Sequence, residues 1–150
     1  MAGVFFTVST GPVTLSRSPQ TVLQIRPPPD HRIKVWHWSL SFTGIDPTAA
    51  PVLVELIRPT AFVSATTLLT PVKVNAGDDE AWQTTCRYLH PSEPAGTTVL
   101  ASFEVHPQYG VGWTAPAFGV GLMVMGGDYL SFRVSGGSGL GVNARVLYEE

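Results

Sequence analysis

The stretch that most constrains the fold is residues 31–44, HRIKVWHWSLSFTG. Read with a period of two, it places four large apolar side chains on one face of an extended chain: Trp36, Trp38, Leu40 and Phe42. The opposite face takes Ile33, Val35, His37, Ser39 and Ser41. Such alternation is typical of a half-buried antiparallel strand. Because each aromatic side chain buries on the order of 200 Å², we expect this strand to be the centre of a β-sandwich, with the four large side chains in its core.

Other segments alternate with the same period and end at proline or glycine: residues 21–26, 52–58, 97–106, 129–135 and 142–149. No stretch shows a convincing helical period longer than a turn or two. The spacing predicts an all-β fold, an antiparallel β-sandwich or jelly roll of about eight strands. A chain of 150 residues fits one such domain.

The first 18 residues differ from the rest of the chain. The segment begins with an apolar patch made of Val4, Phe5, Phe6 and Val8. A Gly-Pro break and the polar segment 16–19 follow it. Two interpretations stand. The segment is either an edge strand of its own domain or an arm that adds a strand to a neighbouring subunit, because an exposed strand with two phenylalanines needs a cover. We expect an extended N-terminal arm over residues 1–18, anchored by Arg17, and a sandwich over residues 19–150.

The composition restricts the possible partners. Charged residues make up 13% of the chain, against about 25% in typical soluble domains. A surface with so few charges favours a homo-oligomer or a docking surface. The net charge of −2 and the pI near 6.0 argue against a nucleic-acid partner. The single cysteine, Cys86, cannot form an intrachain disulfide and is expected to be an apolar filler.

No membrane or secretion signal is found in the sequence. Residues 1–12 lack the basic region and the long apolar core of a signal peptide. No apolar run approaches the roughly 20 residues of a membrane span. We therefore expect synthesis in the cytoplasm and no contact with a membrane.

Catalytic and metal-binding motifs are also missing from the sequence. The four histidines form no HxH or HExxH pair, and no GxSxG motif occurs. Two His-Pro corners, at His90 and His106, are expected to be structural turns. Glu55, on an apolar strand, is either catalytic or, in the favoured interpretation, paired across the sheet. We expect no enzymatic activity, no metal and no cofactor.

One loop offers a binding surface. Tyr109 and Trp113, in the sequence QYGVGW, could form an aromatic platform for sugars, as in lectin-like jelly rolls. In the alternative interpretation, which we favour, Trp113 closes one end of the sandwich.

Several segments together resemble a known family. They are TGIDPTAAPVLVELIR at 43–58, TPVKV at 70–74, EPAGTTVLASFEVHPQYGVGWTAP at 93–116, and GGDYLSFRVS with VNARVLYEE at 126–135 and 142–150. Their order of strands and corners is similar to that of the head decoration (cement) proteins of tailed phages, which are small jelly-roll or tulip-like β-sandwiches. The resemblance covers residues from about 33 to the C-terminus and leaves out the first 18.

The resemblance implies a non-enzymatic virion protein. It would bind the major capsid protein on the outer surface of the mature head, and stabilise the shell, commonly as a homotrimer whose arms latch neighbours. The residues expected in that latch are Val4, Phe5, Phe6, Val8 and Arg17. A function of another class also fits the strand pattern, a receptor- or carbohydrate-binding module of a phage fibre or tail.

Overall fold

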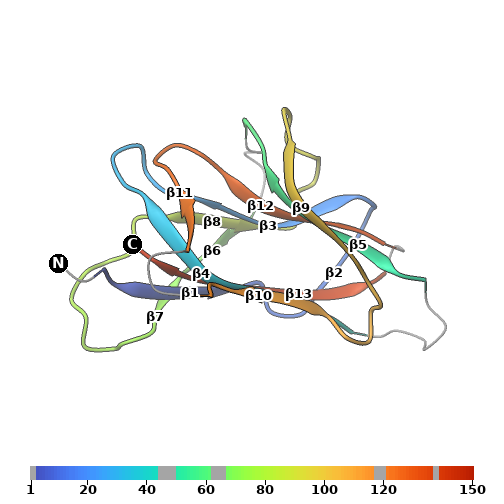
Figure 1. Ribbon diagram of the computed structural model, residues 1–150, viewed down its shortest axis with the longest axis horizontal. Coiled ribbons are helices and arrows are strands. Elements are labelled where there is room, and N and C mark those ends of the chain that lie inside the picture. Colours follow the sequence, from blue (N-terminus) through green and yellow to red (C-terminus); the bar gives the residue numbers. More distant parts are fainter. Residues whose placement is uncertain (1–2, 44–49, 62–66, 117–120, 137–138) are drawn as a thin grey trace.

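The chain folds as two antiparallel β-sheets packed face to face (Figure 1). The computed structural model describes residues 3–43, 50–61, 67–116, 121–136 and 139–150, and its regular structure in these ranges is entirely β-strand. The predicted all-β class and antiparallel sandwich are therefore confirmed. The described residues form thirteen strands instead of about eight, and the additional ones are mostly short, with two to four residues each.

Sheet A contains β1 (Phe5–Ser9), β2 (Val13–Thr14), β4 (Ile33–Thr43), β7 (Val72–Lys73), β10 (Val111–Thr114), β11 (Leu122–Val124) and β13 (Gly141–Glu149). Its order is β10-β4-β13-β1-β7, with β11 also paired to β4 and β2 to β13. Sheet B contains β3 (Gln20–Arg26), β5 (Val52–Arg58), β6 (Thr67–Leu69), β8 (Thr85–Tyr88), β9 (Thr98–Val105) and β12 (Leu130–Ser135). Its order is β6-β8-β3-β12-β5-β9.

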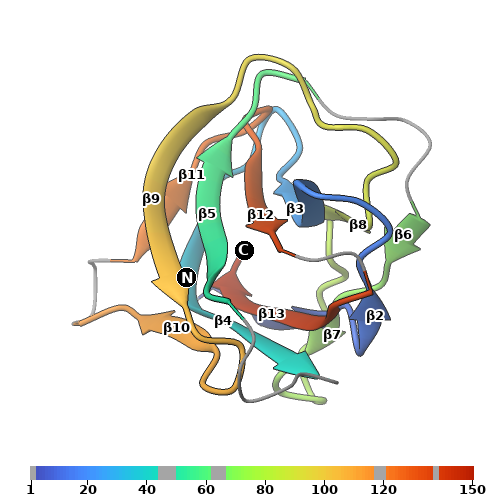
Figure 2. The same cartoon turned by 90° about the vertical axis from the view of Figure 1, so that its right-hand side faces the viewer.

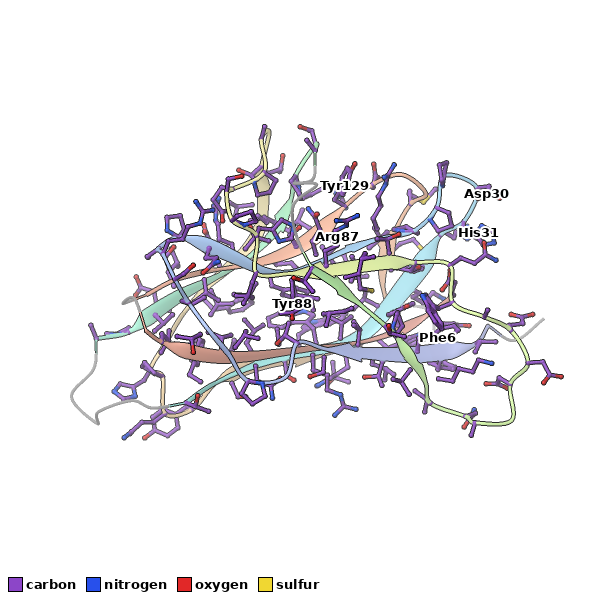
Figure 3. All side chains as sticks on the ribbon, turned by 180° about the vertical axis from the view of Figure 1, so that it is seen from behind. Phe6, Asp30, His31, Arg87, Tyr88 and Tyr129 are labelled. Carbon is purple, nitrogen blue, oxygen red and sulfur yellow. The ribbon has the colours of Figure 1, made fainter. Side chains whose placement is uncertain are left out.

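The core lies between the two sheets. Trp38 of β4 is 2% exposed, and its ring centroid lies 5.3 Å from that of Phe132 and 5.7 Å from that of Phe103, both in sheet B. Phe6 stacks on Tyr148 at 5.7 Å within sheet A. Figure 3 shows Phe6 and Tyr88 in the space between the sheets, whereas Arg87, next along β8, lies on the outer side. This alternation is what a period of two requires of a strand with one buried face.

The predicted core face of residues 31–44 is correct at one end and wrong at the other. Trp38 and Leu40 are buried and Phe42 packs against the core, but Trp36 is only half-buried. The reason is a bulge: Leu147 pairs with His37 while Tyr148 pairs with Val35, so Trp36 is an extra residue. A bulge reverses the faces on its two sides. Ile33 and Val35, expected on the other face, are therefore fully buried in the core.

Of the two interpretations of the N-terminal segment, a strand of the chain's own domain is the correct one, and the expected arm is wrong. β1 lies inside sheet A between β13 and β7, and its register with β13 runs from Phe5 opposite Glu149 to Ser9 opposite Arg145. Three alternating side chains of the proposed latch are buried in the protein's own core: Val4, Phe6 and Val8, at 8%, 1% and 2% exposure. Both edges of β1 are paired, so its backbone groups have hydrogen-bond partners in the same chain. Its apolar face is buried in the same core, so β1 needs no partner subunit. The described residues before position 19 therefore belong to the sandwich, and no boundary falls at residue 18.

A long connection covers the outer face of sheet B. β8 and β9 are consecutive in sequence but lie on opposite sides of β3, β12 and β5, so residues 89–97 must cross these strands, as Figure 2 shows. The connection is fastened at one end by the N–H groups of Leu89 and His90, which donate to the carbonyls of Val22 and Thr21. At the other end, the N–H of Thr60 donates to the carbonyl of Ala95. The crossing encloses a second, polar layer outside the sandwich core.

Candidate functional site

A connected group of polar side chains lies under the β8–β9 connection. Glu93 of the connection accepts hydrogen bonds from the N–H of Thr21 at 2.7 Å and from its hydroxyl at 2.9 Å. The Arg17 guanidinium donates to the same carboxylate at 3.1 Å. A carboxylate so bonded fixes the connection to β3.

A second ion pair continues this network across the sheet. Arg133 of β12 stands directly opposite Glu55 of β5, and its Nε donates to the Glu55 carboxylate at 2.7 Å. Another nitrogen of Arg133 lies 3.9 Å from the Glu93 carboxylate. The favoured interpretation of Glu55 as a cross-strand carboxylate is confirmed. With two arginines matched to two glutamates, every charge of the network already has a partner.

His90 is also part of this layer and is completely buried. Its ring Nε2 lies 3.1 Å from the Oε1 of Gln24. Burial lowers the pKa of His90 to about 4, so the ring is neutral at pH 7. His106, the other His-Pro corner, accepts the N–H of Gln108 at 3.3 Å in the β9–β10 turn. The two corners thus have separate partners among the described residues, and each serves a turn.

The one thiol lies in the interior of the sandwich. Cys86 of β8 is 1% exposed, and burial raises its pKa to about 12. It fills the core as the sequence predicts. Within the described ranges, no three side chains of His, Cys, Asp or Glu are grouped closely enough to hold a metal ion.

An apolar cleft opens between the sheets at the edge formed by β9, β10 and β11. Its volume is about 300 Å³, and its lining comes from both sheets: Trp38, Leu56, Leu100, Ala101, Phe103, Trp113 and Leu122. None of these side chains is charged. A bulge in the pairing of β5 and β9, where Leu56 faces Ala101 and Ile57 faces Val99, leaves Leu100 as the extra residue at the rim. A cleft of this size and lining suits an apolar group.

The two loop aromatics have different surroundings. Trp113 is opposite Trp38 in the register of β10 with β4 and packs against the core, in line with the favoured interpretation that it closes the sandwich. Tyr109 is 85% exposed, and its described ring contact is with His106 at 5.8 Å. Between them, Gly110 has φ of 66°, and a Cβ there would lie 2.7 Å from the Leu40 carbonyl oxygen. The turn thus has one exposed aromatic ring, that of Tyr109, and one ring packed against the core, that of Trp113.

The outer face of sheet A is a third surface of interest. Trp36 lies there, with its ring 6.3 Å from that of Phe5, its Nε1 donating to Glu149 at 2.9 Å, and the Lys34 ammonium 5.2 Å from its centroid. Phe5, expected in a latch, is thus half-exposed on this face, apart from the buried Val4, Phe6 and Val8. Arg17, the proposed anchor, is held by Glu93 of the β8–β9 connection, on the side of sheet B.

Sequence reasoning did not identify Glu93, Arg133 or the cleft itself, although Trp113, one of the residues that line the cleft, was a candidate binding residue. The strand containing Arg133 did carry a signal, since one charge alternating with Leu130, Phe132 and Val134 needs an opposite charge on an adjacent strand. Glu93 lies in a loop, and only the strand order brings it onto β3.

Comparison with protein-family models, with curated proteins and with solved structures finds no match. Among the described residues there is no helix long and apolar enough to span a membrane.

Proposed function

We propose that the protein is a head decoration protein of a tailed phage, which binds the outer surface of the mature capsid as a non-enzymatic, self-associating cement. The observation that carries the proposal is the distribution of surface chemistry. The arginines and glutamates of the polar layer pair with one another and hold the β8–β9 connection. By contrast, the apolar cleft and the weakly charged outer face of sheet A are accessible to partners. The resemblance of residues 33–150 to decoration proteins supports the same function.

The mechanism would be mechanical. A protein that binds the assembled shell but not the separate capsid subunits stabilises the shell by mass action. Many weak contacts repeated over one shell also gain strength from multivalency. A rigid sandwich suits this role, because binding then orders little of the chain and loses little conformational entropy. The partner would be the major capsid protein, and the location would be the outer surface of the virion after synthesis in the host cytoplasm.

Co-sedimentation with shells tests the proposal. The full chain is mixed with expanded shells built from the major capsid protein of the virus that encodes it, and in parallel with the unassembled capsid subunits. We expect saturable binding to shells, with a fixed number of copies for each capsid subunit, and no binding to free subunits. Absence of binding to expanded shells would overturn the proposal.

A second function is favoured by Tyr109 alone, because a tyrosine 85% exposed on a tight turn is a suitable contact for a sugar ring. The protein would then be a carbohydrate-binding module of a phage fibre or tail. Binding to a glycan array distinguishes the two functions. A decoration protein should bind no glycan on the array, whereas a fibre module should bind specific glycans, and the Tyr109→Ala variant should no longer bind them.

A further inference from the structure

The outer face of sheet A has the character of an interface. One continuous row of paired residues crosses five strands and contains a single ionisable side chain, that of His37: Val72, Thr7, Leu147, His37 and Thr114. Val72 and Val74, both on the β7 side of this face, are 62% and 52% exposed. Small hydroxyl and apolar side chains on a sheet face can be covered by a partner at little desolvation cost.

The β9–β10–β11 edge of the sandwich differs from this flat face, because it has an unpaired strand edge beside the apolar cleft. β9 pairs only with β5, so its other edge carries backbone N–H and C=O groups without a strand partner in the described chain. The cleft lies beside this edge, and its rim includes Leu100, which is 39% exposed. An exposed apolar edge of this kind favours association, because β9 contains neither proline nor lysine to prevent it.

The charged residues near this edge indicate which surface binds to it. Glu104 is the one charged residue of β9, and β10 and β11 have none. Arg145 stands on the outer face of sheet A, exposed, with its Nε donating to the Thr7 hydroxyl at 3.3 Å. Within the described ranges neither Glu104 nor Arg145 has an ion-pair partner. The edge thus offers a carboxylate and the face a guanidinium that lack ion-pair partners within the described chain, and these two groups are complementary in charge.

We propose that the β9–β10–β11 edge of one copy docks on the outer face of sheet A of a second copy, with Glu104 of the edge against Arg145 of the face. The inference deepens the self-association in the proposed function and rests on that part of it, but not on shell binding. The two surfaces are different, so the contact is head-to-tail, and such contacts close into a ring when the rotation between copies allows it.

The outer face of sheet A is large enough to supply most of one side of a stable contact. Neighbouring strands lie about 4.8 Å apart, and each residue extends a strand by about 3.3 Å. With these spacings, the five strands β7, β1, β13, β4 and β10 together have a projected area on the order of 500 Å². The accessible area of side chains standing on the sheet is larger than the projection. A standard interface takes about 800 Å² from each partner. The face alone can therefore supply most of one side of the contact.

Charge reversal tests the pairing. We would measure the mass of the wild type, Glu104→Arg, Arg145→Glu and the double variant by light scattering over a dilution series, with Asp128→Arg as an exposed control. Each single reversal is expected to raise the dissociation constant by about tenfold, and the double variant to restore it to within about threefold. The control should leave it unchanged. A monomeric wild type, or singles that match the control, would overturn the inference.

Complementation tests the head-to-tail geometry. Leu100→Asp blocks the edge and Leu147→Asp blocks the face, and circular dichroism verifies that each variant is folded. Each alone should be monomeric, and a mixture should form one-to-one dimers, because each variant keeps the surface that the other has lost. Failure of the mixture to dimerise would contradict the head-to-tail contact. A wild-type monomer that binds shells would overturn this inference and the self-association but leave shell binding standing, whereas an oligomer with no shell binding would overturn the decoration function and leave this inference standing.

Discussion

Phe6 and Phe5 are adjacent in β1 and have opposite environments, which makes them a matched pair for testing the role of the N-terminal segment. Phe6 is 1% exposed and stacked on Tyr148, whereas Phe5 is half-exposed on the outer face beside Trp36. Truncating a buried phenylalanine costs about 3–5 kcal/mol, from lost transfer energy and the cavity left behind. Truncating Phe5 removes one aromatic contact at the surface, which contributes about 1 kcal/mol.

The assay is urea denaturation followed by tryptophan fluorescence, with the free energy of unfolding obtained by linear extrapolation. We expect Phe6→Ala to lower it by about 3–5 kcal/mol and Phe5→Ala by about 1 kcal/mol, with similar slopes. Because a domain of this size is stable by about 5–15 kcal/mol, Phe5→Ala should remain folded in water, and Phe6→Ala should as well when the wild type is stable by more than about 5 kcal/mol. Equal, small losses for both would refute the placement of β1 in the core and would restore the arm.

Three further predictions concern single residues. Trp36→Phe should lower the free energy of unfolding by about 1 kcal/mol or less, but Trp38→Ala by about 3–5 kcal/mol, because only Trp38 is in the core; the reverse order in urea denaturation would contradict the bulge. The folded-state pKa of His90, about 4, lies below the ordinary 6.5, so its contribution to stability is complete above pH 6.5 and is lost as the pH falls toward 4. Urea denaturation at a series of pH values should therefore show stability decreasing over this window, and His90→Gln should reduce that dependence; an identical pH profile would exclude His90 as its source. Cys86, with its pKa raised to about 12, should react with a thiol reagent at pH 8 far more slowly in the folded chain than in urea, and equal rates would place it at the surface.

Strand alternation was sufficient to predict the fold class but not the bulges. The period of two identified the strands containing Trp38, Leu56 and Phe132, since each has one buried face. The bulge at Trp36 depends on the register of β4 against β13, which lie about a hundred residues apart. Period alone therefore assigned Ile33 and Val35 to the wrong face.

The N-terminal segment shows a different limit. Residues 4–8 alternate as well as any strand, and the sequence cannot show whether their partner strand lies in the same chain or in another. The pairing with β13 decides it. Likewise, the polar layer and the cleft arise from the strand order of sheet B, which places the loop that contains Glu93 across β3 and leaves β9 at an edge. Local patterns do not encode that order.

Shell stability is the most direct test of the proposed function. Virions that lack the protein would be heated with a DNA-binding dye, with and without added purified chain, and the temperature of DNA release would be recorded. We predict release at a higher temperature when the chain is added, saturating at the copy number found by co-sedimentation. Release at the same temperature, with the protein bound at full occupancy, would contradict a cementing role.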